Sequence, residues 1–122
     1  MGYGSTGWTG NMVRRYKPKQ GDIVYITLDP QSGHEQSGRR PALIVSNNDF
    51  NEKARLALFC PISNTDRPFP LHVTLAGQSS IKGFVFCEHL KSLDYESRNV
   101  QFVEKVQVDT LDEVLHILSL CF

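Results

Sequence analysis

Short apolar runs separated by polar turns dominate the chain from residue 22 onwards. We expect strands at residues 22–28, 41–46, 56–62, 71–75, 83–87 and 100–106. The second run is apolar at almost every position, which is typical of a strand buried on both faces. Many short strands at close spacing predict a mainly β domain, either a small barrel or a sandwich.

Two segments carry a helical pattern instead. In residues 110–120 an apolar stripe recurs at positions i, i+3, i+4 and i+7, formed by Leu111, Val114, Leu115 and Leu118. Such a stripe predicts a helix that packs against the sheet. Thr110 followed by Glu113 predicts a capping box at its start. The polar residues 47–55 predict a loop with a short helix, and His116 is expected to play no part in a functional site.

Composition sets the size and class of the protein. With 122 residues, 40% hydrophobic and 21% charged, the chain is expected to be one soluble domain. No apolar run approaches the roughly 18 residues of a membrane span, and a signal-peptide pattern is lacking, so we expect a cytoplasmic protein. Residues 1–11 are uncharged and rich in Gly, Ser and Thr, which is typical of a tag or disordered extension. The domain is therefore expected to span residues 12–122.

Three cysteines, Cys60, Cys87 and Cys121, are scattered without C-x-x-C spacing. This argues against a disulfide framework or a zinc site. Cys60 and Cys87 lie in apolar runs and are expected to be small buried residues. No His, Cys and Asp cluster has the spacing of metal ligands, so we expect no metal and no other cofactor.

A net charge of zero hides an asymmetry along the chain. Residues 12–67 contain nine Lys/Arg and six Asp/Glu, a net of +3, whereas residues 68–122 contain four and seven, a net of −3. The first half therefore has room for a basic patch, although such clusters are often only a solvated face. The clustered residues are Arg14, Arg15, Lys17, Lys19, Arg39 and Arg40.

The polar, glycine-punctuated segment 29–41 lies between two expected strands. Its chemically active side chains are His34, Glu35, Gln36, Arg39 and Arg40. Arginine offers a planar fork to phosphate oxygens, and a carboxylate or imidazole can move a proton. The segment therefore suits an anionic substrate such as a phosphodiester. The alternative is an ordinary solvated hairpin loop.

Several motifs along the chain match one family. The most specific is G-H-E-Q-S-G-R-R-P at residues 33–41, which follows L-D-P and precedes A-L-I-V-S. With these motifs the chain resembles the MazF/PemK endoribonuclease toxins of bacterial type II toxin–antitoxin modules, from residue 12 to the C-terminus. Further matches are M-V-R-R-Y at 12–16, G-D-I-V at 21–24, C-P-I-S at 60–63, Pro70, L-A-G at 75–77 and E-H-L-K-S-L at 88–93.

The resemblance implies a fold, an activity and partners. The fold is a small SH3-like β-barrel with short helices and a C-terminal helix. Family members are homodimers with RNA in a groove along the dimer interface. They act as mRNA interferases, cutting single-stranded RNA at short sequences without a metal and leaving a 2′,3′-cyclic phosphate and a 5′-hydroxyl. A cognate antitoxin covers the groove with an extended acidic tail.

The resemblance also implies catalytic residues. Arg40 occupies the position of the arginine that stabilises the charge of the transition state; alternatively, it is held in an ion pair with Glu35. Glu35 either accepts the proton of the 2′-hydroxyl or orients Arg40. Ser63 matches a threonine of the family and can hydrogen-bond the scissile phosphate, with Thr65 as the alternative if the match is displaced.

Six further residues are expected to bind RNA. His34 can act as a base or stack on a nucleobase, but it neighbours Glu35, and adjacent residues of an extended segment face opposite ways. Glu88 can accept a hydrogen bond from an exocyclic amine. His89 replaces a glutamine found in some relatives, which puts the base preference in doubt. The full set is His34, Gln36, Arg67, Glu88, His89 and Lys91; the last four can instead be plain surface residues.

Two other functions fit the same fold class. One is a gyrase poison of the CcdB type, which has a similar fold but different chemistry. The other is a non-catalytic RNA-binding barrel, which would bind RNA without cutting it. The G-x-E-Q-x-G-x-R-P motif favours the nuclease.

Overall fold

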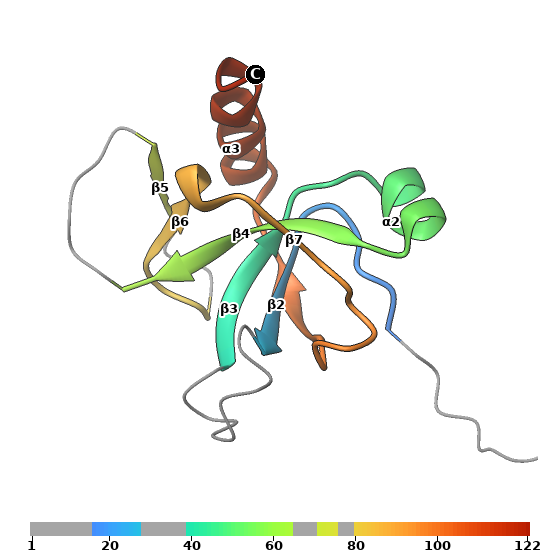
Figure 1. The fold of residues 1–122 in the computed structure, drawn as a ribbon. Coiled ribbons are helices and arrows are strands. Elements are labelled where there is room, and N and C mark those ends of the chain that lie inside the picture. The colour runs from blue at the N-terminus through green and yellow to red at the C-terminus, as the bar shows by residue number, and fades with distance from the viewer. Residues whose placement is uncertain (1–15, 28–38, 65–70, 76–79) are drawn as a thin grey trace, which may run out of the picture.

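Seven strands and three helical segments form the described part of the chain. A computed structural model describes residues 16–27, 39–64, 71–75 and 80–122. In chain order its elements are β2 (Asp22–Thr27), β3 (Arg39–Ile44), α2 (Asn48–Ala54), β4 (Ala57–Ser63), β5 (His72–Thr74), β6 (Phe84–Phe86), η1 (Cys87–His89), β7 (Lys91–Leu93), β8 (Gln101–Lys105) and α3 (Val108–Leu120) (Figure 1).

The strands pair antiparallel in one curved sheet. Its order is β5-β6-β4-β3-β2-β8, and β7 also pairs with β4. Within the described residues no pairing joins β5 to β8, so the sheet is barrel-like without being a closed ring. None of the described helices is long and apolar enough to cross a membrane.

A slip in register on one edge of β4 produces η1. Ile62 of β4 faces Val85 of β6, and Phe59 of β4 faces Lys91 of β7. The two positions are three residues apart on β4, but their partners, Val85 and Lys91, are six residues apart. Three residues are therefore extra on the β6–β7 side, and they are the three residues of η1, Cys87–His89. Extra residues are pushed out of a ladder, as in a β-bulge. As a result, η1 lies outside the β4 ladder, with Cys87 buried in the core and Glu88 and His89 exposed.

Two apolar clusters cover the two faces of the sheet. One cluster includes Ile23, Leu43 and Val85 and is closed by Val114 and Leu118 of α3. The other is built from the alternate positions of the same strands and is closed by the segment around Leu93 and Tyr95; its sheet residues are Val24, Ile26, Ala42, Ile44 and Phe59. Residues 42–46 are all buried, so the prediction of a strand buried on both faces is confirmed.

The two central cysteines are buried, as predicted. Cys60 and Cys87 are 0% and 2% exposed and carry free thiols within the α3-covered cluster. The hydrogen bond with the Cys87 side chain, together with burial, raises the pKa of the Cys60 thiol well above its usual value. A protonated, inaccessible thiol is a poor nucleophile, so Cys60 serves packing. Cys121 lies exposed at the end of α3.

The predicted capping box of α3 is wrong. The helix begins at Val108, two residues earlier than expected, and Gln107 is the N-cap residue, with no side-chain cap bond. Thr110 lies inside the first turn and is 6% exposed, so its side chain packs against the core instead of capping the helix. The apolar stripe is confirmed, since Val114 and Leu118 are buried and Leu111 and Leu115 pack beside them. His116 is exposed on α3.

Asp22 anchors the start of β2. Its buried carboxylate accepts hydrogen bonds from the Tyr16 hydroxyl and, at 3.1 Å, from the Lys19 backbone N–H. The Lys105 ammonium of β8 lies 2.5 Å from the other carboxylate oxygen. Burial, followed by the hydrogen bond to Asp22, raises the pKa of the Tyr16 hydroxyl, which keeps it protonated as a donor. The aspartate of the G-D-I-V motif, Asp22, therefore has a structural role.

Asn51 of α2 ties three segments together and is 2% exposed. Its side-chain amide donates to the carbonyls of Pro18 (3.1 Å) and Ser46 (3.2 Å), and its side-chain oxygen accepts from the Ser46 hydroxyl. The Tyr95 hydroxyl donates to its backbone carbonyl at 3.0 Å. The predicted short helix within 47–55 is confirmed as α2, and the hydrogen bonds of Asn51 hold it against the rest of the domain.

We expect Asn51→Ala to lower the free energy of unfolding by about 2–3 kcal/mol, because buried carbonyls lose their donors. Asn48→Ala is the matched control, since exposed Asn48 only accepts a hydrogen bond from the Gln20 backbone N–H; it should cost under about 1 kcal/mol. Urea titration of both variants measures the difference. Equal urea midpoints for the two variants would show that the hydrogen bonds of Asn51 contribute no more to stability than the exposed hydrogen bond of Asn48.

Candidate active site

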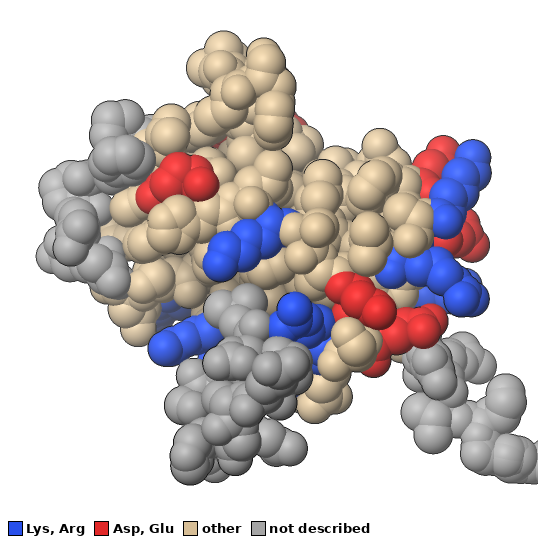
Figure 2. Space-filling model, viewed as in Figure 1, with Lys and Arg blue, Asp and Glu red and all other residues tan. Residues whose placement is uncertain are grey.

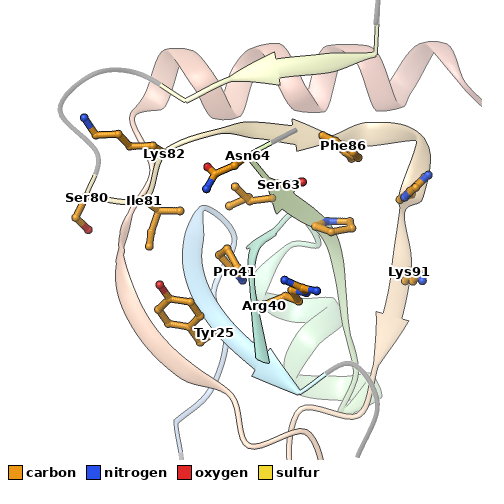
Figure 3. A pocket seen from close by; sticks show the side chains of 13 residues that line it. Tyr25, Arg40, Pro41, Ser63, Asn64, Ser80, Ile81, Lys82, Phe86 and Lys91 are labelled. Carbon is orange, nitrogen blue, oxygen red and sulfur yellow. The ribbon is translucent and has the colours of Figure 1, made fainter. Parts of the chain in front are cut away.

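A hollow of about 910 Å³ opens where strands β2, β3, β4 and β6 meet the segment 80–82. Figure 3 shows side chains reaching it from several elements, with Lys82 on one side, Lys91 on the other and Arg40 between them. The residues that matter for its chemistry are Arg40, Ser63, Lys82, Phe86, His89 and Lys91.

Arg40 and Ser63 are brought together by strand register. Ala42 of β3 faces Pro61 of β4, so continuing the antiparallel register by two residues places Arg40 opposite Ser63. Residues directly opposite each other project on the same face of a sheet. Both side chains line the hollow, and Arg40 forms no hydrogen bond or ion pair with any described residue. Within the described part of the chain, its guanidinium therefore has no competing partner.

The neighbouring arginine has a different role. Arg39 donates to the Asn99 carbonyl (2.6 Å), to the Thr27 hydroxyl (3.2 Å) and to the Gln101 side-chain oxygen (3.2 Å). Successive residues of a strand point to opposite faces, which explains how two adjacent arginines separate. Arg39 joins β3 to β2 and to the β8 end, while Arg40 faces the hollow.

Strand β3 begins earlier than predicted. We expected a strand from Pro41, with both arginines in the preceding loop, but β3 starts at Arg39. The Arg40 backbone is thus held by pairing with Ile26 of β2. A guanidinium on a paired strand is fixed more firmly than one on a loop, which suits a group that must meet a phosphate at a defined place.

The wall beside Ser63 depends on Gly83. Gly83 has a φ of +128°, and a Cβ added there would lie 2.3 Å from the Ser63 carbonyl oxygen. Only a glycine permits this approach. The wall is also held at Ser80, whose N–H lies 3.2 and 3.1 Å from the two carboxylate oxygens of Glu104 on β8. Together these contacts place Lys82 at the rim.

Of the residues predicted to bind RNA in segment 88–93, two line the hollow and one does not. His89 of η1 and Lys91 of β7 line the hollow, as a substrate-binding role requires. Glu88 does not line it; its carboxylate is 2.7 Å from the His72 ring nitrogen Nε2. Sequence reasoning missed His72, Phe86 and Lys82, because their position depends on cross-strand register and no local motif marks them.

Several predicted site residues lie outside the described residues. They are His34, Glu35, Gln36 and Arg67, together with Thr65, the alternative to Ser63. Their roles, and the alternative ion pair between Arg40 and Glu35, stay predictions.

The charge of the hollow is positive. Arg40, Lys82 and Lys91 line it, and no carboxylate is found among its described lining residues. Figure 2 shows Lys and Arg side chains across the middle of the molecule, with Asp and Glu side chains beside them on the lower side and around α2. An uncompensated group of cations favours an anionic ligand. Within the described segments, no group of three His, Cys, Asp or Glu side chains is placed to hold a metal ion.

These features define a small, mainly β protein with a cationic hollow that suits an anionic ligand. The family model for the PemK-like, MazF-like toxin of type II toxin-antitoxin systems matches residues 19–122, and the chain belongs to this family.

Curated relatives include the endoribonuclease toxin MazF of Escherichia coli strain K12, which is 34% identical over 87 residues, 71% of this chain and 78% of the relative. Endoribonuclease PemK of Escherichia coli is 34% identical over 119 residues, 93% of this chain and 90% of the relative.

Solved structures agree. MazF of Deinococcus radiodurans (Form-I) has a TM-score of 0.77 at 36% identity, covering 88% of this chain and 97% of that one. A MazE-MazF structure from the same organism (Form-II) has a TM-score of 0.76 at 30% identity and covers 88% and 96%. The predicted family and the mainly β, barrel-like fold with a C-terminal helix are confirmed.

Proposed function

We propose that this chain is an endoribonuclease toxin that cleaves single-stranded RNA at a short sequence without a metal ion or other cofactor. The observation that carries the proposal is Arg40, fixed on β3 opposite Ser63, lining a cationic hollow and unbound by any described residue. The curated relatives MazF and PemK, both named endoribonucleases, support the reaction class.

In the proposed reaction the 2′-hydroxyl oxygen attacks the adjacent phosphorus and the bond to the 5′-oxygen breaks. The products are a 2′,3′-cyclic phosphate and, once the leaving 5′-oxygen has taken up a proton from solvent, a 5′-hydroxyl. Negative charge builds on the non-bridging oxygens, where the guanidinium fork of Arg40 stabilises the transition state more than the ground state. The Ser63 hydroxyl donates to the same phosphate.

Proton transfer requires a second group. Arginine stays protonated under ordinary conditions and is a poor base. Glu35 remains our candidate for accepting the 2′-hydroxyl proton, with His34 as the alternative; both lie outside the described residues. We propose that Lys91, His89 and Lys82, which line the same hollow, contact the RNA on either side of the scissile phosphate.

The partners follow from the same charge pattern. We propose that a cognate antitoxin inhibits the chain with an extended acidic tail, because a carboxylate-rich strand complements Arg40, Lys82 and Lys91. Solved MazE-MazF structures support an antitoxin partner. We further propose that the chain acts in the cytoplasm as a homodimer.

The test uses the purified protein and a long single-stranded RNA in buffer containing EDTA. We expect discrete cuts at one short motif, with 5′-hydroxyl ends mapped by ligation-based sequencing. Cleavage that appears only after Mg²⁺ is added would refute the metal-independent mechanism. RNA that stays intact across varied sequences would refute the nuclease, and a supercoiling assay would then separate a gyrase poison from a non-catalytic RNA-binding barrel.

A further inference from the structure

Two cysteines face each other on the side of the sheet that α3 covers. Ile62 of β4 faces Val85 of β6, and continuing that antiparallel register by two residues places Cys87, the first residue of η1, opposite Cys60. The pairing of β6 with β5 extends as far as Cys87, because its N–H donates to the Leu71 carbonyl at 3.2 Å. Residues directly opposite each other project on the same face of a sheet. Accordingly, both cysteines belong to the apolar cluster covered by α3.

The geometry of this pair suits a disulfide. The Cys87 N–H points to Leu71 of β5 and away from β4, so Cys87 faces β4 at a non-hydrogen-bonded position. The Cα atoms of such pairs lie about 4.5 Å apart, within the range of roughly 4.4–6.8 Å that disulfides span. The two thiols are free and are hydrogen-bonded to each other. The pair therefore needs only a small movement to become covalent.

The two thiols differ in reactivity. The hydrogen bond from Cys60 lowers the pKa of the Cys87 thiol, and the same hydrogen bond raises the pKa of the Cys60 thiol. Because the thiolate is the form that attacks an oxidant, Cys87 is the residue that reacts first. Cys60, which packs the core in the reduced protein, needs no thiolate character for the second step, since a thiol condenses with a sulfenic acid held beside it.

Access to Cys87 comes from the edge of the sheet. Cys87 is 2% exposed and Cys60 is 0% exposed, so an oxidant reaches them only after a local opening. Cys87 lies among β5, β6 and η1, each three residues long, and β5 is the edge strand of the described sheet. Short edge elements open at a lower free-energy cost than central strands. A small neutral oxidant can therefore reach Cys87 while β4, which also pairs with β3, keeps Cys60 in place.

We propose that Cys60 and Cys87 form an oxidisable pair, which hydrogen peroxide converts into an intramolecular disulfide that joins β4 to η1. The Cys87 thiolate attacks one peroxide oxygen, the O–O bond breaks, and hydroxide leaves as Cys87 becomes a sulfenic acid. The Cys60 sulfur then attacks the Cys87 sulfur, the S–O bond breaks, and the hydroxyl leaves as water with the Cys60 proton. The first hydroxide takes up the proton that Cys87 had lost, so two thiols are oxidised and one peroxide is reduced to two waters.

The expected consequence is a stiffer wall of the hollow. Pro61 follows Cys60 and Phe86 precedes Cys87, and both of these neighbours line the hollow. The bond closes a loop of roughly 27 residues, which restricts the unfolded chain. It also holds the start of η1 against β4. Oxidation therefore suppresses opening of this edge, and in a cytoplasm that keeps thiols reduced the bond forms only while an oxidant is supplied.

Peptide mapping of the whole protein tests the proposal directly. The folded chain is treated with hydrogen peroxide, remaining thiols are blocked with N-ethylmaleimide, and the protein is digested with trypsin without a reductant. Cys60 and Cys87 fall in different tryptic peptides, 56–82 and 83–91, and Cys121 falls in a third, 106–122. We expect peptides 56–82 and 83–91 to appear joined, two hydrogens lighter than their sum, and to separate on addition of dithiothreitol. Thiols that stay fully blockable, or Cys87 oxidised to a sulfinic acid without the link, would overturn the proposal.

Three cysteine variants test the order of the two steps. Cys60→Ala should accumulate a Cys87 sulfenic acid that dimedone traps, whereas Cys87→Ala should leave Cys60 unreacted. Cys121→Ser is the matched control, because it removes the exposed thiol and should leave the link unchanged. Oxidation of Cys60 at the wild-type rate in Cys87→Ala would refute the assigned order. A link that disappears in Cys121→Ser would refute a direct reaction between the two buried thiols. Mapping of the wild-type chain decides on the link itself even where an alanine variant does not fold.

A thermal melt measures whether the native fold accommodates the bond. We expect oxidation to raise the melting temperature of Cys121→Ser by about 5 °C or more, and dithiothreitol to reverse the rise. Peroxide should leave the melting temperature of Cys87→Ala unchanged. A lower melting temperature in the linked protein would show that the bond distorts the fold, which would overturn the stiffening. Mass and melting are both independent of RNA cleavage, so the oxidisable pair and the proposed nuclease can fail separately.

Discussion

Arg40→Ala is expected to lower RNA cleavage by about 10²-fold or more, a typical loss for a group that stabilises charge in a transition state. The variant should fold normally, because Arg40 is exposed and forms no bond with a described residue. Arg40→Lys should also be poor, since a lysine cannot reproduce the planar fork. Cleavage rates in EDTA and a thermal melt measure the two properties.

Arg39→Ala is the control for this prediction, since it removes the same charge from the next position of the same strand. Arg39 bonds to Thr27, Asn99 and Gln101 and points away from the hollow, so its loss should affect stability and leave cleavage within about threefold. If Arg40→Ala changes cleavage by less than threefold, Arg40 has no catalytic role. If both variants lose activity equally, general positive charge explains the effect.

Gly83→Ala is expected to lower the free energy of unfolding by more than about 3 kcal/mol, because strain and a clash add together. A φ of +128° is strained for alanine, and the added Cβ would lie 2.3 Å from a backbone oxygen that has no room to move. The disturbed residue is Ser63, so cleavage should fall as well.

The control for Gly83→Ala is Lys82→Ala, judged by stability alone. Lys82 is the neighbouring residue and is exposed, so its substitution should stay within about 0.5 kcal/mol. Urea denaturation measures both. A Gly83→Ala protein with wild-type stability would show that the segment before β6 does not approach β4 as closely as described here.

The strands were predictable because apolar runs and turn residues mark them locally. Each expected strand is found, with ends that differ by one or two residues. The start of β3 matters most, since the arginines look like loop residues by composition but pair with β2. β7 was missed because Lys91–Leu93 is short and has little apolar character outside its register with β4.

The residues of the site were predictable only where a local sequence motif marks them. Arg40, Ser63, His89 and Lys91 were found by resemblance of motifs, and all four line one hollow. The positions of Phe86 and His72 beside the hollow were not predicted, since a phenylalanine in an apolar run is typical of a core residue. Only the pairing of β5 with β6 shows that the Phe86 ring stacks on His72.

The three-residue slip along β4 has a consequence for how such a protein can diverge. The pairs of β6 and β7 with β4 are fixed on either side of η1, and Cys87 within η1 is buried in the core, so only the exposed positions Glu88 and His89 can change while the sheet and core stay the same. Arg40 and Ser63 sit on the paired strands, apart from this segment. Under the proposed function, substitutions at these two exposed positions are expected to change contacts beside the hollow while Arg40 and Ser63 keep their places.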